Sequence, residues 1–305
     1  MASGVLIGCG IGALVIVALL RLGHLGGREG LSAVTGDVER VLRHYAMKDE
    51  AGRLWATARG ELTRRRTWDI FARFLPETGQ IADIGGGPGT HASHLAGLGY
   101  DVVLVDPVPK HIEQASARAA DAGFSCHLGD ARSLPLPDAC FDAVLLMGPL
   151  YHLADAADRQ SALREALRVL RPGGRLLAEV ISRYAWIIDA TARGLLNDQW
   201  DTFELNLRTG QSSTLDRPDE VFWAYFHRPE EVGPEVERAG FVHERLLAVE
   251  GFAGPLGNLE DLLREPEQLM RVIRLTESEP AMLGVSAHLM AVASKPVSNV
   301  GAAAE

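Results

Sequence analysis

The chain has 305 residues, of which 47% are apolar and 23% are charged. This composition is typical of a globular protein, and the length allows one large domain with additions. The formal net charge of −10 argues against a general affinity for nucleic acid. The densest basic cluster, Arg64–Arg66, is predicted to be a solvated helix face rather than a polyanion site. The cysteines Cys9, Cys126 and Cys140 lack metal-site spacing and indicate a reducing compartment, so we expect a cytoplasmic protein.

The N-terminal region carries a long uncharged segment. Gly4–Leu20 is near the minimum length for a membrane-spanning helix, and it lacks the basic region and cleavage site of a signal peptide. Three interpretations stay open: a membrane anchor, a helix that packs elsewhere, and an extension without a role. Glycine-rich His24–Gly36 resembles a linker. We therefore expect an N-terminal segment and linker at 1–36, the main domain at 37–296 and a disordered tail at 297–305.

Helices are expected before the first strand. Asp37–Leu75 is predicted to form two or three of them, because apolar residues recur at helical spacing until Pro76. Tyr45 and Arg53 in this region are candidate cofactor or substrate contacts, with plain packing as the alternative.

The next stretch, Gln80–Leu98, combines an apolar run, a glycine-rich turn and a helical pattern. Strand, glycine turn and helix in that order form a nucleotide-binding crossover, in which bare backbone lets a ligand approach closely. The glycines Gly85, Gly87 and Gly89 do not have the spacing of the dinucleotide fingerprint. Asp83, two residues before them, would repel a pyrophosphate but suits a ligand that carries an ammonium group.

Each of the next two predicted strands is followed by an aspartate. Asp101–Val105 ends at Asp106, 23 residues after Asp83, and Phe124–Leu128 leads to Asp130 after another 24 residues. A carboxylate at the tip of the second strand can accept both hydroxyls of a ribose. For Asp106 the alternative is a local role at the start of the next helix.

Together these motifs resemble the class I S-adenosylmethionine-dependent methyltransferases. The passage Leu170–Gly174, Leu-Arg-Pro-Gly-Gly between a helix and a strand, is similar to the small-molecule branch of the ubiquinone-biosynthesis type. The resemblance covers Arg66–Val180 well and continues more loosely to Lys295. It implies an α/β fold with a Rossmann-like seven-stranded sheet, mostly parallel with an antiparallel last strand. Helices would flank this sheet, with N-terminal helices and an inserted lid added.

The resemblance also implies S-adenosylmethionine as the cofactor and assigns residues to its parts. Asp83 would lie near the methionine ammonium, Asp106 would bind the ribose, and Asp130 would accept the exocyclic amine of adenine. The implied cofactor-binding residues are Asp83, Gly85, Gly87, Gly89, Asp106, Pro107, Asp130, Ala131, Met147 and Gly148.

The loop Gly148–His152 would face the methyl group. His152 is the candidate general base, because imidazole titrates in the useful range, and the Tyr151 hydroxyl would orient the acceptor. Packing roles are the alternative for both. His91 and His94 have no carboxylate or cysteine to complete a metal set, so no metal site is predicted and both are expected at the surface.

The region 182–228 is rich in aromatic residues and is predicted to be a lid over the acceptor pocket, or alternatively an ordinary satellite core. Trp186, Tyr225 and His227 are its candidate substrate contacts. After it, the strands His243–Gly251 and Val285–Ala293 are expected to form an antiparallel hairpin, as the resemblance implies.

The predicted function is methyl transfer to an O, N or C atom of a small, partly apolar metabolite. Two alternatives stay open: a nicotinamide-dependent oxidoreductase, and a non-catalytic, membrane-tethered accessory protein that binds the cofactor. The acidic surface favours a small-molecule partner over nucleic acid. The sequence does not indicate an oligomeric state.

Overall fold

The computed structural model describes residues 39–45, 48–196, 200–212 and 224–297. Its contacts divide the chain into Met1–Glu39 and Arg40–Glu305, and the description below concerns the second unit. The predicted segments Gly4–Leu20 and His24–Gly36 lie outside the described residues, as does most of the tail after 297. Within the described ranges, no helix is long and apolar enough to cross a membrane.

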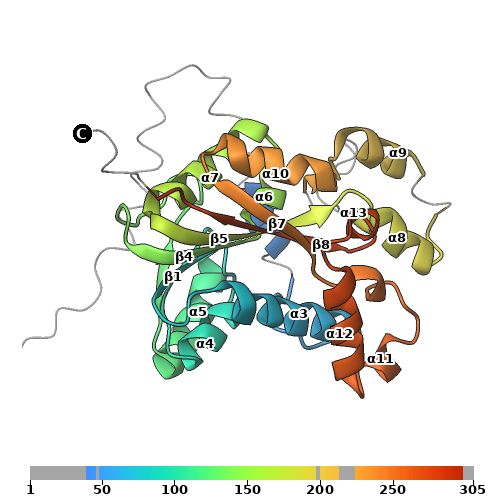
Figure 1. Ribbon diagram of the computed structural model, residues 1–305, viewed down its shortest axis with the longest axis horizontal. Coiled ribbons are helices and arrows are strands. Elements are labelled where there is room, and N and C mark those ends of the chain that lie inside the picture. Colours follow the sequence, from blue (N-terminus) through green and yellow to red (C-terminus); the bar gives the residue numbers. More distant parts are fainter. Residues whose placement is uncertain (1–38, 46–47, 197–199, 213–223, 298–305) are drawn as a thin grey trace, which may run out of the picture. The chain divides into compact units, whose positions relative to one another are not determined.

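A single eight-stranded sheet forms the centre of this unit (Figure 1). The strand order is β3-β2-β1-β4-β5-β8-β7, with β6 beside the end of β5. Strands β1 to β6 pair in parallel, whereas β8 runs antiparallel to both β5 and β7. The strands are β1 Gln80–Ile84, β2 Asp101–Asp106, β3 Ser125–Leu128, β4 Phe141–Met147, β5 Leu170–Ser182, β6 Phe226–His227, β7 Val242–Ala248 and β8 His288–Ser294.

The predicted architecture is confirmed, with one correction to the number of strands. The sheet is mostly parallel, and β7 and β8 form the expected antiparallel hairpin. The prediction of seven strands was wrong because the inserted region contributes one more: Phe226 pairs with Ile181, and His227 pairs with Ser182. A strand of two residues is too short to show the alternation from which strands are recognised.

Helices cover both faces of the sheet (Figure 1). On one face α3 Ala58–Phe74, α4 Thr90–Gly97 and α5 Pro109–Ala122 bury apolar side chains such as Phe71 and Leu95. On the other face α7 Ala156–Val169 and α10 Pro229–Arg238 do the same. Parallel strands that are buried on both faces explain the nearly continuous apolar runs in the sequence.

The remaining helices are short, and most lie near the carboxyl ends of the strands or in the inserted region. The predicted helix Leu259–Leu275 is divided in two, because Pro266 is favoured at the first position of a helix and disfavoured inside one. These helices are a segment at 39–45, α6 Pro149–His152, α8 Ala185–Ala192, α9 Trp200–Thr209, α11 Leu259–Leu262, α12 Pro266–Thr276 and α13 Pro280–Leu283.

Arg66 of α3 is fully enclosed, so the predicted solvated face was wrong for this residue. Its guanidinium donates to Asp69 and Glu277, both at 2.5 Å, and to the carbonyl oxygen of Val249 at 2.9 Å. Arg73 also pairs with Glu277, at 2.6 Å. These contacts join α3 to the segment after β7 and to the end of α12.

We predict that Arg66→Met lowers the free energy of unfolding by about 3 kcal/mol or more, because it leaves buried carboxylates short of a charge partner. Urea unfolding measures this. The matched control is Arg65→Met on the same helix, whose ion pair with Glu61 is partly exposed and should contribute less than about 1 kcal/mol. Equal losses from the two variants would contradict the assignment.

Candidate active site

The glycine turn between β1 and α4 has a backbone that other residues would strain. Gly85, Gly87 and Gly89 have φ values of +73°, +55° and +81°, in the left-handed region that favours glycine. A Cβ at Gly86 would lie 2.6 Å from Oδ2 of Asp83. The turn therefore needs glycine both for its conformation and for its close approach to Asp83.

Asp83 is a fully buried carboxyl group at the end of β1. Neither of its oxygens has a hydrogen-bond partner within the described part of the chain. Burial raises the pKa of Asp83 to about 7, and the negative charge of Asp106 adds to the increase, while the backbone amide of Ala92 acts weakly in the opposite direction. A positively charged ligand group placed here would stabilise the ionised form and reverse this shift.

Asp106 lies at the end of β2 and binds the glycine turn directly. Its Oδ2 accepts a hydrogen bond from the amide of Gly87 at 2.9 Å, while Oδ1 accepts one from the amide of Val108 and contacts Nδ1 of His111 at 3.0 Å. Two carboxylate oxygens have about four acceptor positions, so these contacts leave capacity for a ligand hydroxyl. The alternative prediction for Asp106, a local role at the start of the next helix, is also observed, because Asp106 accepts from the amide of Val108 just before α5.

Asp130 follows β3, next to the end of β2, where the amide of Gly129 donates to the carbonyl oxygen of Asp106 at 3.1 Å. Unlike Asp83, the carboxylate of Asp130 already has an ion-pair partner. Arg132 pairs with Asp130 at 2.6 Å and with Asp158 at 2.8 Å. Topology thus brings the three predicted aspartates to one edge of the sheet. Their electrostatic environments differ, and a contact between Asp130 and adenine stays a prediction.

The turn after β4 lies against the glycine turn. A Cβ at Gly148 would be 3.5 Å from the Tyr151 hydroxyl and 3.6 Å from the carbonyl oxygen of Gly85. Gly148 has a φ of +145° and begins the short helix α6, directly after Met147. The predicted cofactor-binding residues at the end of β4 therefore lie next to those of the glycine turn.

Segment 39–45 connects α5 and α6, the helices that follow β2 and β4, through Tyr45. The Tyr45 hydroxyl lies 2.8 Å from Nε2 of His152, and its ring contacts that of His111 with centroids 4.7 Å apart. Burial raises the pKa of Tyr45 well above its usual value. Tyr45 and His152, two separate sequence predictions, are thus brought together.

A buried acidic and basic cluster at the ends of β5 and β8 was missed by the sequence analysis. Its members are Glu179, His288 and Glu250, together with the pair Glu50 and Arg53. Nδ1 of His288 lies 2.6 Å from Oε1 of Glu250, and this pairing contributes to a pKa of about 9 for His288. One sequence signal existed: Glu179 occupies a position of β5 in phase with the buried Leu177.

The candidate lid contacts have two different environments. Trp186 stacks on Phe226 with centroids 6.0 Å apart, in an apolar cluster that includes Tyr151. Tyr225 lies under the guanidinium of Arg159, 3.9 Å from its ring centroid, and its hydroxyl donates to Glu231 at 3.1 Å. The aromatic residues at 222 and 223 lie outside the described residues.

His227 is completely enclosed. Its Nε2 lies 2.8 Å from Oε2 of Glu235, which also pairs with Arg159 at 2.8 Å. Burial lowers the pKa of His227, although Glu235 acts in the opposite direction. In the described structure its ring therefore offers no surface to a substrate, and its substrate role stays a prediction.

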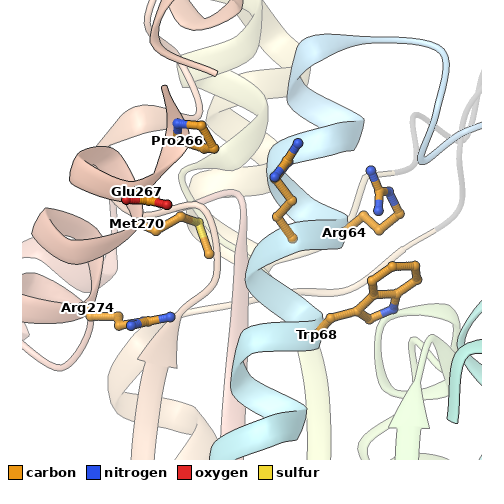
Figure 2. Close-up of a pocket in the computed structure, with 7 residues that line it drawn as sticks. Arg64, Trp68, Pro266, Glu267, Met270 and Arg274 are labelled. Carbon is orange, nitrogen blue, oxygen red and sulfur yellow. The ribbon is translucent and has the colours of Figure 1, made fainter. Parts of the chain in front are cut away.

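His91 and His94 were expected at the surface, but they pack against Trp68 of α3 and are partly buried. Trp68 stacks on His94 with centroids 3.7 Å apart and donates from Nε1 to His91 at 3.1 Å. Burial lowers the pKa of His91 to about 3, and the charge of Arg53 adds to the effect. Trp68 and Arg64 also line a surface pocket of about 430 Å³ between α3 and α12 (Figure 2), which contains none of the predicted site residues.

Comparisons with known proteins match this arrangement. Residues 82–178 match the family model described as "Methyltransferase domain". A demethylmenaquinone methyltransferase of Beutenbergia cavernae is 29% identical over 76% of this chain and 89% of its own length. A ubiquinone/menaquinone biosynthesis C-methyltransferase of Caulobacter vibrioides is 31% identical over 49% of this chain, which spans only 61% of that relative. The fold is similar to that of an S-adenosylmethionine-dependent methyltransferase from Methanosarcina mazei, with a TM-score of 0.52 and 18% identity over 75% of this chain and 97% of that chain.

The chain is a class I S-adenosylmethionine-dependent methyltransferase, similar to the ubiquinone-biosynthesis type. The sheet order and the antiparallel hairpin agree with this assignment. The nicotinamide-dependent and non-catalytic alternatives are therefore set aside. The buried, unpartnered carboxyl group of Asp83 fits the cofactor, because the methionine part of S-adenosylmethionine carries an ammonium group.

We predict that Asp83→Asn stabilises the protein without cofactor at pH 8 by about 4 kcal/mol, because the pKa difference of about 3 units corresponds to about 1.36 kcal/mol per unit. The folded-state pKa of about 7 exceeds the ordinary aspartate value of 3.8, so the wild type loses stability as the pH rises between these values. Near pH 4 both proteins have a neutral group and the difference should vanish. Urea unfolding at pH 4 and pH 8 measures it.

The control is Asp101→Asn at the exposed start of β2, which should change the free energy of unfolding by less than about 0.5 kcal/mol. A variant at position 83 that is less stable than wild type at pH 8 would contradict the unpartnered, buried state of this carboxyl group.

Proposed function

We propose that this enzyme methylates a ring carbon of a small, partly apolar quinol. The names of the relatives support the acceptor class, because one acts on demethylmenaquinone and another is a C-methyltransferase of quinone biosynthesis. The apolar cluster of Tyr151, Ile181, Ala224 and Phe226, with Trp186 packed against it, supports an aromatic acceptor beside α6. Aromatic rings pack well against such side chains.

The single observation that carries the proposed cofactor site is the unpartnered Asp83 beneath the glycine turn. In this proposal Asp83 binds the methionine ammonium together with the carbonyl at Met147 or Gly148. The backbone of Gly85–Gly89 packs against the methionine, and Asp106 accepts hydrogen bonds from the ribose. The bound sulfonium supplies an electrophilic methyl group. The protein's task is then to orient the acceptor, exclude water and move protons.

His152 is proposed to accept the proton from an acceptor hydroxyl. It lies on α6 directly after Tyr151, at the turn that meets the glycine turn, and the Tyr45 hydroxyl holds its Nε2 at 2.8 Å. This contact fixes the ring, so its orientation does not depend on the acceptor. Loss of the hydroxyl proton increases the electron density of a quinol ring and makes its carbon nucleophilic.

We predict that Asp106→Ala weakens S-adenosylmethionine binding at least tenfold, which corresponds to about 1.4 kcal/mol. The variant removes both the acceptor for the ribose hydroxyls and the contact that holds Gly87. Isothermal titration calorimetry measures the affinity. Asp101→Ala, at the opposite end of the same strand, is the control and should bind as wild type does. Unchanged affinity in Asp106→Ala would reject the ribose assignment.

We predict that His152→Ala lowers kcat for 1,4-naphthohydroquinone by about 100-fold and leaves cofactor affinity within twofold. Methyl transfer from radiolabelled cofactor under anaerobic conditions measures the rate. The control is His127→Ala, an exposed histidine on β3. If wild type and His152→Ala have the same rate across the pH range, His152 is not the base. If wild type transfers no methyl group to this quinol, the proposed acceptor class is wrong.

A further inference from the structure

Glu179 is a buried carboxyl group that none of the roles above uses. It lies near the end of β5, opposite Met147 of β4 and Met290 of β8. The residue is only 5% exposed, and no residue in the described ranges forms a hydrogen bond with its side chain. Unlike the oxygens of Asp83, its oxygens are not sealed from solvent. A small part of this carboxyl group therefore stays accessible.

The charged groups around Glu179 form pairs that exclude it. Arg53 pairs with Glu50 in the segment before α3, and His288 of β8 pairs with Glu250, which also accepts from Thr63 at 2.7 Å. Glu179 has no ion-pair partner of its own among the described residues. Burial raises the pKa of Glu179, while the charges of His288 and Arg53 act to lower it. One negative charge is left over, on a carboxylate suited to accept a proton.

Glu179 also belongs to the acceptor side of the site. Its register partner Met147 is followed directly by Gly148, whose Cβ position is 3.5 Å from the Tyr151 hydroxyl. The charge of Glu179 contributes to the raised pKa of Tyr151, after the larger effect of burial. Glu179 and His152 thus approach the same region from different elements, β5 and α6.

We propose that Glu179 is a second proton acceptor in this enzyme, and that it removes the ring proton from the carbon that has received the methyl group. The proposal rests on the proposed function, because only methylation at carbon leaves such a proton to be removed. It assigns separate proton transfers to His152 and Glu179.

The proposed sequence balances. His152 accepts the hydroxyl proton, and the ring carbon forms a bond to the methyl carbon as the methyl–sulfur bond breaks and its electron pair stays on sulfur. Glu179 then takes the hydrogen of that carbon as a proton, and the C–H electron pair restores the aromatic ring. The ring oxygen recovers the proton held by His152. One proton is released per methyl group, through Glu179.

The test uses the full chain, S-adenosylmethionine and 1,4-naphthohydroquinone that is either unlabelled or deuterated at ring carbons 2 and 3. In wild type we expect one deuterium to be lost per methyl group, without a primary isotope effect on the rate. Glu179→Gln should slow single turnover by about 100-fold and make proton removal rate-limiting, so that a primary deuterium isotope effect appears. Cofactor affinity should stay as in wild type, and the unfolding midpoint should not fall, because the substitution removes a buried charge.

Glu244→Gln is the matched control, because Glu244 of β7 is a partly exposed carboxylate that pairs with Arg175 of β5. It should behave as wild type in every assay. Glu179→Asp keeps a carboxylate in a native environment and should recover part of the rate, which separates proton transfer from a folding defect. NMR titration of side-chain ¹³C-labelled glutamate, assigned by comparison with Glu179→Gln, needs no turnover. It should show a Glu179 pKa above the usual glutamate range.

The outcomes separate this inference from the proposed function. Retention of both deuterium atoms in wild-type product would show methylation at oxygen and overturn both. Loss of deuterium in wild type, with no isotope effect and an unchanged rate in Glu179→Gln, would overturn the role of Glu179 alone. If wild type transfers no methyl group to this quinol, the proposed function is wrong. An ordinary pKa for Glu179 in the NMR titration would independently contradict its role as the second proton acceptor.

Discussion

The site depends on a carboxyl group, Asp83, that is buried near the end of β1 without a hydrogen-bond partner in the described structure. An unpaired charge in such a place is costly, so the pKa of about 7 keeps much of this group neutral near neutral pH. The glycine turn covers Asp83 so closely that a side chain at Gly86 would collide with it. This arrangement lowers the stability of the protein without cofactor and favours binding of a cationic group.

A second set of charges frames the acceptor side and is supported from outside by α3. Thr63 of this helix donates to Glu250, and Arg66, one turn further on, donates to the carbonyl oxygen of Val249. The same helix therefore positions the carboxylate that pairs with His288. The pairing of Met147 with Glu179 across β4 and β5 connects this acceptor side to the cofactor side. The two groups of buried charges thus share one rigid sheet, which explains how two reactants could be oriented together.

Local patterns were sufficient to predict the glycine turn, Asp83, Asp106 and the mostly parallel sheet, because each depends on residues close together in the chain. Other features depend on distant segments. Glu179 becomes part of a charged cluster only because β8, more than 100 residues later, places His288 beside it. Arg66 looked exposed because its partner Glu277 lies far along the sequence. The stacking of Trp68 on His94 likewise needs two helices to pack.

The most direct test of the central claim is the proton released when S-adenosylmethionine binds at pH 6. Calorimetric titrations in buffers of different ionisation enthalpy give this number. If the cofactor's ammonium lies at Asp83, binding should ionise this carboxyl group and release most of one proton, whereas 5′-methylthioadenosine, which lacks the amino acid part, should release none. Equal release with both ligands, or none with S-adenosylmethionine, would contradict the account.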